Sequence, residues 1–177
     1  MSTPVLYMFS ILSLLSSGAI FGFFYAWVCS TMWGLDAVDP ALAIGAMQAM
    51  NASVRNAVFA PAFFGTPFIL IATAMLAWFC QRRAASLIFA IAGLLYLSGG
   101  MILTMTVNVP MNEALAAVAI PQDATEARRI WENYSGPWQF WNTVRTIISG
   151  VTLALTGIAI FISNPRGHER LSQKFPI

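Results

Sequence analysis

The fourth apolar segment of the chain contains an arginine with a tryptophan and an asparagine on the same helical face. Trp138, Asn142 and Arg145 recur at i, i+4 and i+7. If a helix begins at Pro137, Arg145 lies about 12 Å into it, within the hydrocarbon of a membrane. A charge at that depth is costly, so Arg145 should face other helices and hold a partner. It is either a structural arginine that snorkels or binds backbone carbonyls, or an anion-binding arginine in an outward-opening cavity.

Polar residues that could accompany Arg145 occur in two other parts of the chain. Asn108, Asn112 and Glu113 surround Pro110 at the end of the third apolar segment. Proline removes a backbone donor, so we expect the membrane helix to end there, with the asparagines capping freed backbone groups. Asn51, Asn108 or a loop carboxylate could each be the partner of Arg145, and the sequence does not choose among them.

Metal ligands are scarce in the chain. The one histidine, His168, lies in the polar C-terminal tail, and the two cysteines, Cys29 and Cys80, lie in apolar segments outside any CxxC motif. The cysteines are either inert membrane thiols or, as the alternative, metal or disulfide partners. The apolar spans themselves contain no histidine and no acid. We therefore expect no metal site and no haem within the bundle.

The elements that position these residues are membrane helices. Of the 177 residues, 58% are hydrophobic and only 9% are charged, too few charges to cover the surface of a soluble domain. No basic patch could follow a nucleic-acid backbone, so a nucleic-acid partner is not expected. Four segments are long enough to span a bilayer. The predicted fold is an all-α, four-transmembrane-helix bundle forming a single domain over residues 1–177, with spans at about 5–33, 58–80, 84–107 and 141–162.

The two long connections are expected to contain short amphipathic helices. Asp39-Pro40 is typical of a helix start, and Met47, Asn51 and Arg55 recur every fourth residue after it. In the second connection, Asp123 begins a helix that should run to about Tyr134. Ser135-Gly136-Pro137 should then break the chain before the fourth membrane helix.

Basic residues predict the orientation. Arg82-Arg83 forms a tight turn between the second and third spans, and the tail from Asn164 to Lys174 is also basic. The positive-inside rule places both in the cytoplasm, with the N-terminus beside them by parity. The long connections carry six of the seven acids and should lie outside, in the periplasm if the protein belongs to a bacterial inner membrane. The first span lacks a basic leader region and is expected to be retained.

Aromatic and methionine residues allow two interpretations. Trp33, Trp131, Trp138 and Trp141 suit an interfacial belt, although Trp138 also shares a face with Arg145. Met47 and the other methionines suit flexible core packing or the wall of a pocket for a flat aromatic ligand.

Together these residues resemble the anthrone-oxygenase-like family of small four-helix membrane proteins. The resemblance covers nearly the whole chain, and it rests on four elements: Met47-Gln48-x-x-Asn51, Asn108-Val109-Pro110-x-Asn112, Trp131-x-x-Tyr134 and Trp138-x-x-x-Asn142-x-x-Arg145. Characterised members are fungal enzymes that oxidise anthrones to anthraquinones. The resemblance therefore implies a cofactor-independent membrane oxygenase for an apolar, anthrone-like substrate.

The resemblance also implies roles for individual residues. In the implied reaction, a base removes the benzylic proton and leaves an enolate. The enolate reacts with O₂ to give a hydroperoxide, which loses water to form the quinone. Arg145, Asn142 and Asn108 would stabilise the oxyanion, and Glu113 is the candidate base. The expected substrate-binding residues are Asn51, Asn112, Tyr134, Trp138 and Met47.

Two other functions remain open on the sequence. The chain could be a non-enzymatic binder of a quinone or another small hydrophobic molecule, or a structural or assembly subunit, and it could form a homo-oligomer. The first would need a lined cavity around Arg145. The second would be favoured by Arg145 in a dry ion pair without a void.

Overall fold

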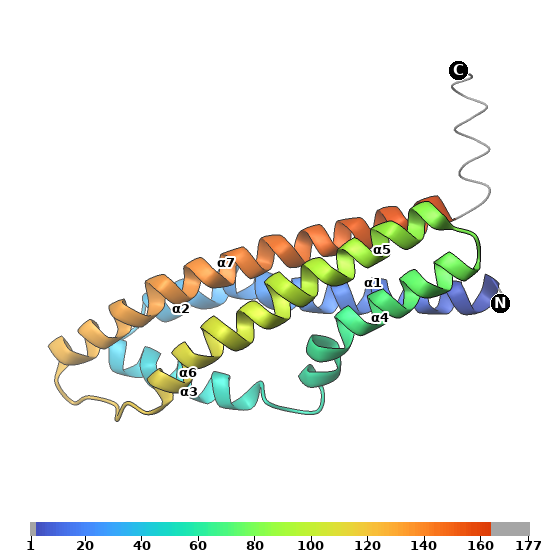
Figure 1. Ribbon diagram of the computed structural model, residues 1–177. Coiled ribbons are helices and arrows are strands. Elements are labelled where there is room, and N and C mark those ends of the chain that lie inside the picture. The colour runs from blue at the N-terminus through green and yellow to red at the C-terminus, as the bar shows by residue number, and fades with distance from the viewer. Residues whose placement is uncertain (1–2, 164–177) are drawn as a thin grey trace, which may run out of the picture.

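A computed structural model describes residues 3–163 as helices and short connections (Figure 1). Four helices in this range are long and apolar enough to cross a membrane: Pro4–Asp36, Phe59–Phe79, Arg83–Ala116 and Ala124–Ser163. The predicted all-helical bundle with four membrane spans is therefore confirmed. The basic tail after residue 163, including His168, lies outside the described residues.

The four long helices form a ring. The first comprises α1 (Thr3–Ala26), η1 (Trp27–Thr31) and α2 (Met32–Asp36), where η denotes π-helix. α1 packs against α4 (Phe59–Phe79) and α7 (Ala124–Ser163), and α5 (Arg83–Leu95) packs against the same two helices. Each long helix therefore has two neighbours, and its remaining surface is available to lipid.

The first connection contains α3 (Pro40–Ser53), which begins where Asp39-Pro40 predicted a helix start. Asp39 caps it, because its Oδ1 accepts hydrogen bonds from the backbone N–H groups of Ala41 (3.0 Å) and Leu42 (3.3 Å). The helix ends before Arg55, which lies in the turn that leads to α4. The predicted shared face therefore holds for Met47 and Asn51 but not for Arg55.

The third helix does not end at Pro110 as expected. It continues from α5 through η2 (Tyr96–Ile102) and η3 (Thr104–Asn108) into α6 (Val109–Ala116). At the end of η3 the N–H of Val109 donates to the carbonyl of Thr104, five residues back. The backbone has thus already left the α-helical hydrogen-bond register before the proline, so the missing donor of Pro110 at the start of α6 does not break the helix.

The predicted break at Ser135-Gly136-Pro137 is also wrong. α7 is one helix of 40 residues, and Pro137 lies inside it. The ring of a proline clashes with the N–H and the Cβ of the preceding residue in a helix, and Gly136 has no Cβ, which lessens the clash. Membrane helices tolerate such prolines where neighbouring groups satisfy the freed backbone. The helix predicted from Asp123 to Tyr134 is therefore the first part of α7.

The continuity of α7 changes the depth of Arg145. The expected depth was counted from Pro137, which is not a helix start. Counted from the other end, Arg145 is 18 positions from Ser163, or about 27 Å. That is close to the whole hydrocarbon thickness of about 30 Å, so Arg145 lies toward one edge of the membrane rather than at its centre.

The helices extend beyond the hydrocarbon and include acids that the predicted spans left out. Asp36, at the end of α2, accepts hydrogen bonds from Trp131 Nε1 (2.9 Å), Ser135 Oγ (2.7 Å) and Gln139 Nε2 (2.8 Å) on α7. Asp36 thereby fastens the first helix to the fourth. Because Trp131 is buried in this contact, it is not the interfacial belt residue that was expected, whereas Trp33 is well exposed.

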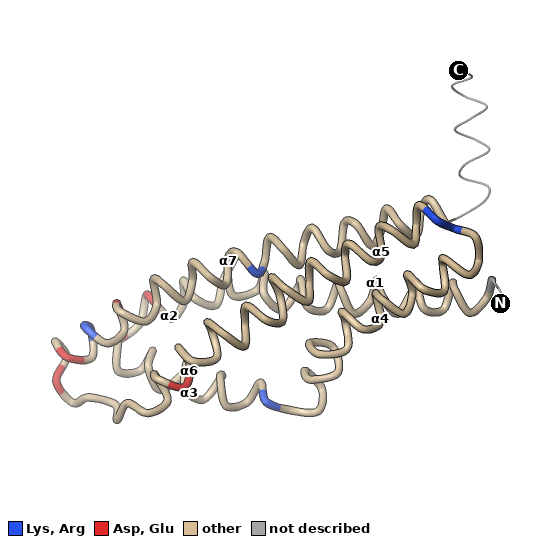
Figure 2. The backbone as a smooth tube through the Cα atoms, in the orientation of Figure 1, with Lys and Arg blue, Asp and Glu red and all other residues tan. Residues whose placement is uncertain are grey.

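The two ends of the bundle differ in charge (Figure 2). Arg82 and Arg83 lie at one end, here called the turn end, where α1 begins and α7 finishes. The acids gather at the opposite end, here called the loop end, around the connections 37–39 and 117–123. Arg55, Arg128 and Arg129 also lie toward the loop end, among the acids, so the two ends differ in net charge. The expected orientation therefore rests on the Arg82-Arg83 turn, the short connection whose charged residues are all basic.

A topology experiment follows from the charge separation. We expect cysteines placed in the Arg82-Arg83 turn to be protected from a membrane-impermeant thiol reagent in intact cells. Cysteines at Asp39 and Asp123 should be labelled, because the short basic Arg82-Arg83 turn is the kind of connection that is retained in the cytoplasm and both sites lie at the opposite end of the bundle. The measurement is labelling before and after permeabilisation, in a background where Cys29 and Cys80 are replaced. Labelling of the Arg82-Arg83 turn in intact cells would show that the protein has the opposite orientation in the membrane.

Candidate functional site

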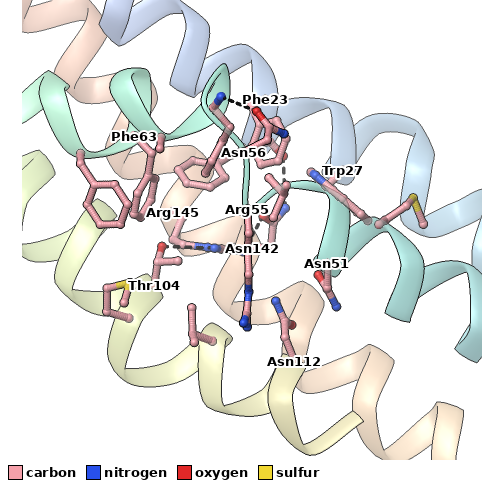
Figure 3. Close-up of a pocket in the computed structure, with 18 of the residues that line it drawn as sticks. Phe23, Trp27, Asn51, Arg55, Asn56, Phe63, Thr104, Asn112, Asn142 and Arg145 are labelled. Carbon is pink, nitrogen blue, oxygen red and sulfur yellow. Dashed lines mark hydrogen bonds between the residues drawn. The ribbon is translucent and has the colours of Figure 1, made fainter. Parts of the chain in front are cut away.

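A cavity of about 590 Å³ lies toward the loop end of the bundle (Figure 3). Its lining comes from η1 and the end of α1, the end of α3, the connection 54–57, the start of α4, η3, α6 and α7. This volume falls in the range of small-molecule sites. The cavity therefore has room for a ligand of three fused rings.

Arg145 forms part of the cavity wall and is only 4% exposed. Its Nη1 donates to Thr104 Oγ1 (3.2 Å), and its Nη2 donates to Asn142 Oδ1 (2.9 Å). Asn142 is itself fixed, since its Nδ2 donates to the carbonyl of Phe24 (3.1 Å). Arg145 is thus held in one orientation by neutral oxygens on two helices, as Figure 3 shows.

The charge of Arg145 has no carboxylate partner within residues 3–163. The two ion pairs in that range join Arg55 to Glu113 and Arg129 to Glu126. The guanidinium carbon lies 4.6 Å from the ring centroid of Phe24 and 5.5 Å from that of Trp138, contacts that offset part of the charge. Its buried Nε has no hydrogen-bond partner among the described groups. Nε is shielded, but Nη1 and Nη2 each carry a second N–H, so the guanidinium can still donate to a ligand oxygen.

Aromatic rings form the walls beside Arg145. Phe23 lies 4.6 Å from Phe59 between ring centroids, and Phe59 lies 5.3 Å from Phe63 in a stacked arrangement. On the side of α7, Trp27 lies 5.1 Å from Trp138. All five rings line the cavity. Such walls suit a flat apolar molecule.

A polar network fixes the wall nearest the loop end. Asn112 Oδ1 accepts hydrogen bonds from Tyr134 Oη (2.8 Å) and Trp138 Nε1 (2.9 Å). Tyr134 Oη in turn accepts one from Asn51 Nδ2 (3.3 Å). Asn51, Asn112 and Trp138 line the cavity, whereas Tyr134 lies behind them. Tyr134 therefore supports the wall instead of forming it.

The rim of the cavity carries the one carboxylate among its described lining residues. Glu113 Oε1 lies 3.3 Å from Arg55 Nη2, and the two side chains are 60% and 62% exposed. Arg55 belongs to the connection between α3 and α4, and Glu113 belongs to α6, so the pair closes the rim. Glu113 is within reach of the cavity contents but is solvated and paired with a cation.

The structure brings most of the predicted site residues together. Six of the nine line the cavity: Asn51, Asn112, Glu113, Trp138, Asn142 and Arg145. The remaining three predicted residues, Met47, Asn108 and Tyr134, do not line the cavity. Met47 is fully buried in the core between α3 and α7. Asn108 is also buried, and both of its side-chain amide atoms lack partners among the described groups.

Sequence reasoning missed the residues that face Arg145 from the other helices. These are Phe24 and Trp27 on the first helix and Phe63 on α4. Thr104 on η3 was not among the expected site residues either. A regular spacing signal exists for Thr104 alone, in the stripe of Tyr96, Gly100, Thr104 and Asn108. The aromatic residues lie in continuously apolar segments, where no periodicity singles them out.

A comparison with known protein families assigns this chain to one of them. A model of the anthrone oxygenase family matches residues 55–155. The chain belongs to the anthrone oxygenase family. The match to this family includes α4, the third helix and α7 as far as residue 155. It is narrower than the resemblance first indicated, because it leaves out Met47 and Asn51 and the first helix with Phe24 and Trp27. The chain matches no curated protein and no solved structure.

Metal ligands do not gather in the part of the chain that the structure describes. No group of three or more histidine, cysteine, aspartate and glutamate side chains lies close enough to hold an ion there. Cys29 belongs to η1 toward the loop end, and Cys80 follows α4 at the turn end. The two cysteines are therefore too far apart for the disulfide that was the alternative.

Proposed function

We propose that this protein is a membrane oxygenase that oxidises a flat, apolar aromatic ketone of the anthrone type with O₂. One observation carries the proposal: the aromatic cavity contains a fixed, buried arginine with no carboxylate partner within residues 3–163. An arginine in that setting stabilises an anionic oxygen more strongly than a neutral one. Membership of the anthrone oxygenase family supports the same class of reaction.

The reaction balances with O₂ as the oxidant. A base removes one proton from the benzylic CH₂ group, and the electron pair moves into an enolate whose oxygen is anionic. The enolate transfers one electron to O₂, and the two radicals combine to form a C–O bond, giving a hydroperoxide after protonation. Loss of water breaks the O–O bond and leaves the second carbonyl of the quinone. The ketone and O₂ thus give quinone and water, with no other electron donor.

The geometry divides the roles among the residues. Arg145 would bind the enolate oxygen. Asn142 and Thr104 are positioning residues, because their side-chain oxygens accept from Arg145 and hold its guanidinium in place. Glu113 is the candidate base, since it is the one carboxylate among the described lining residues. Phe24, Phe63 and Trp27 would contact the rings and exclude water.

A turnover assay tests the proposed function. Purified protein in lipid vesicles should accelerate formation of quinone from an anthrone, with one O₂ consumed per quinone. The measurement combines an oxygen electrode with the visible absorbance of the quinone. Vesicles without protein give the rate of spontaneous oxidation. A rate equal to that of the empty vesicles, for a panel of anthrones that demonstrably bind, would contradict the proposal.

A non-enzymatic binder is the second candidate. It is favoured by the exposure of Glu113 and its pairing with Arg55, which do not prepare a strong base. Arg145-dependent binding of a hydroxyanthraquinone without turnover of any anthrone would support this candidate. The third possibility, a purely structural subunit, would have been favoured by Arg145 in a dry ion pair without a void. Within residues 3–163 Arg145 has no ion pair, and it lines a cavity.

A further inference from the structure

The shortest membrane helix sets the level of the cavity in the bilayer. α4 has 21 residues and a length of about 31 Å, which matches the hydrocarbon thickness of about 30 Å. It carries no charged residue, and Arg55 and Arg82 flank it in sequence. The other three helices have 33, 34 and 40 residues and must project beyond the hydrocarbon. Phe59, the first residue of α4, therefore lies near the hydrocarbon edge at the loop end.

The cavity begins at that edge and extends into the hydrocarbon. α4 contributes Phe59, Ala60, Phe63 and Phe64 to the lining, all within about 8 Å of the start of the helix. Arg145 and Thr104 line the same cavity at the level of these rings. The cavity therefore lies within the outermost layer of acyl chains, beside lipid rather than above the membrane.

One side wall of the cavity is exposed on the lipid-facing surface. Phe64 on α4 and Met105 on η3 both line the cavity, and each is 45% exposed. α4 packs on α5 and η2 nearer the turn end, whereas η3 packs mainly on α6, η2 and α7. α4 and the third helix thus separate at the level of the cavity. The polar rim of Arg55, Asn56 and Glu113 lies at its other side, toward water.

We propose that the cavity opens sideways into the bilayer between Phe64 and Met105, and that its ligand enters from lipid by this route. The occupant is an apolar aromatic molecule already dissolved among the acyl chains, with an oxygen that reaches Arg145. Such a molecule need not cross the charged rim. O₂, which dissolves better in hydrocarbon than in water, reaches the same point. The chemical identity of the ligand rests on the proposed function, but the lateral opening does not.

Spin-label accessibility tests the opening without any ligand. Single cysteines at Phe64 and Met105, in a background with Cys29 and Cys80 replaced, carry a nitroxide in lipid vesicles. Ile147, 61% exposed on α7 close to Arg145 in sequence, is the lipid control, and Asn56 on the rim is the aqueous control. Labels at 64 and 105 should match Ile147, with strong relaxation by O₂ and little by a water-soluble nickel chelate. Labels that match Asn56, or that neither reagent reaches, would overturn the lateral opening.

Exchange kinetics test the route. A fluorescent dihydroxyanthraquinone is first dissolved in the membrane of the vesicles. The specific binding signal is the fluorescence of the wild-type protein minus the fluorescence of the Arg145→Met variant. Met105→Trp should slow association and dissociation several-fold while the Kd stays within about twofold, because a residue at an entrance changes rates and not the end states. Val54→Trp, which places the same bulk at the aqueous rim, should leave both rates unchanged.

A failure of the lateral route and a failure of the proposed function give different results. Slower exchange in Val54→Trp but not in Met105→Trp would overturn the lateral route, even with binding intact. A probe signal that Arg145→Met leaves unaltered would contradict the proposed function instead. In that case the spin-label comparison still decides whether the cavity opens to lipid.

Discussion

Replacing Arg145 with methionine should lower the rate of anthrone oxidation by about 100- to 1,000-fold, the cost typical of losing one oxyanion-stabilising group. The fold should survive, because the change removes a buried charge that has no carboxylate partner in residues 3–163. Arg145→Lys keeps the charge but loses the planar donors that meet Asn142 and Thr104. We expect Arg145→Lys to fold normally and to retain only part of the activity. The measurements are turnover and thermal unfolding in the same lipid.

The matched control for Arg145 is another arginine on the same helix. Arg129→Met removes an exposed pair with Glu126, and its side chain is about 24 Å further along α7. Exposed pairs contribute little to stability, so activity and stability should both stay near wild type. If Arg145→Met unfolds the protein while Arg145→Lys does not, the arginine is structural. If both Arg145 variants keep full turnover, the site assignment is wrong.

Of the variants proposed for this protein, Asn112→Leu should lose the most free energy of unfolding. Asn112 Oδ1 is the acceptor for both Tyr134 Oη and Trp138 Nε1, whose side chains are buried. Each buried donor left without an acceptor costs about 1–3 kcal/mol, so Asn112→Leu should cost roughly 2–6 kcal/mol in all. The protein should unfold at a clearly lower temperature or denaturant concentration. Ligand binding should weaken as well, because Trp138 lines the cavity.

Asn112→Asp is the conservative control, since it keeps an acceptor oxygen at the same position. We expect it to recover most of the stability lost in Asn112→Leu. Tyr134→Phe, which removes one donor and leaves Trp138 bonded, should have an intermediate effect. An Asn112→Leu variant that unfolds together with the wild type would show that the network does not stabilise the bundle.

The sequence was sufficient to predict the membrane helices and six of the residues that line the cavity. Four apolar segments and two arginines in a short turn define the bundle and its charge asymmetry. Trp138, Asn142 and Arg145 were recognisable because a charge in an apolar helix is costly and needs neighbours on its own face. Asp39 was recognisable as a cap because Pro40 follows it.

The errors arose where tertiary context overrides a local rule. Pro137 and Pro110 were expected to break helices, but Gly136 lessens the clash at Pro137 and a preceding π-helical segment accommodates Pro110. Asn108 was placed in the site because it is one of the polar residues around Pro110 and part of the motif that carries the family resemblance, and neither signal fixes the direction of its side chain. η2 and η3 also widen the helical turn, so a spacing of four residues does not predict a shared orientation there. Phe24 contacts Arg145, and Phe63 lines the same cavity, only because helices distant in sequence pack around it, which no local pattern records.

The central claim is that Arg145 binds an oxygen of an aromatic ligand inside the cavity. The most direct measurement is a crystal structure of the protein in a lipid phase with a bound hydroxyanthraquinone. The account predicts the rings between Phe63 and Trp27, with one ligand oxygen within hydrogen-bond distance of the Arg145 guanidinium. A ligand bound elsewhere, or a cavity filled by lipid chains while saturating ligand is present, would contradict it.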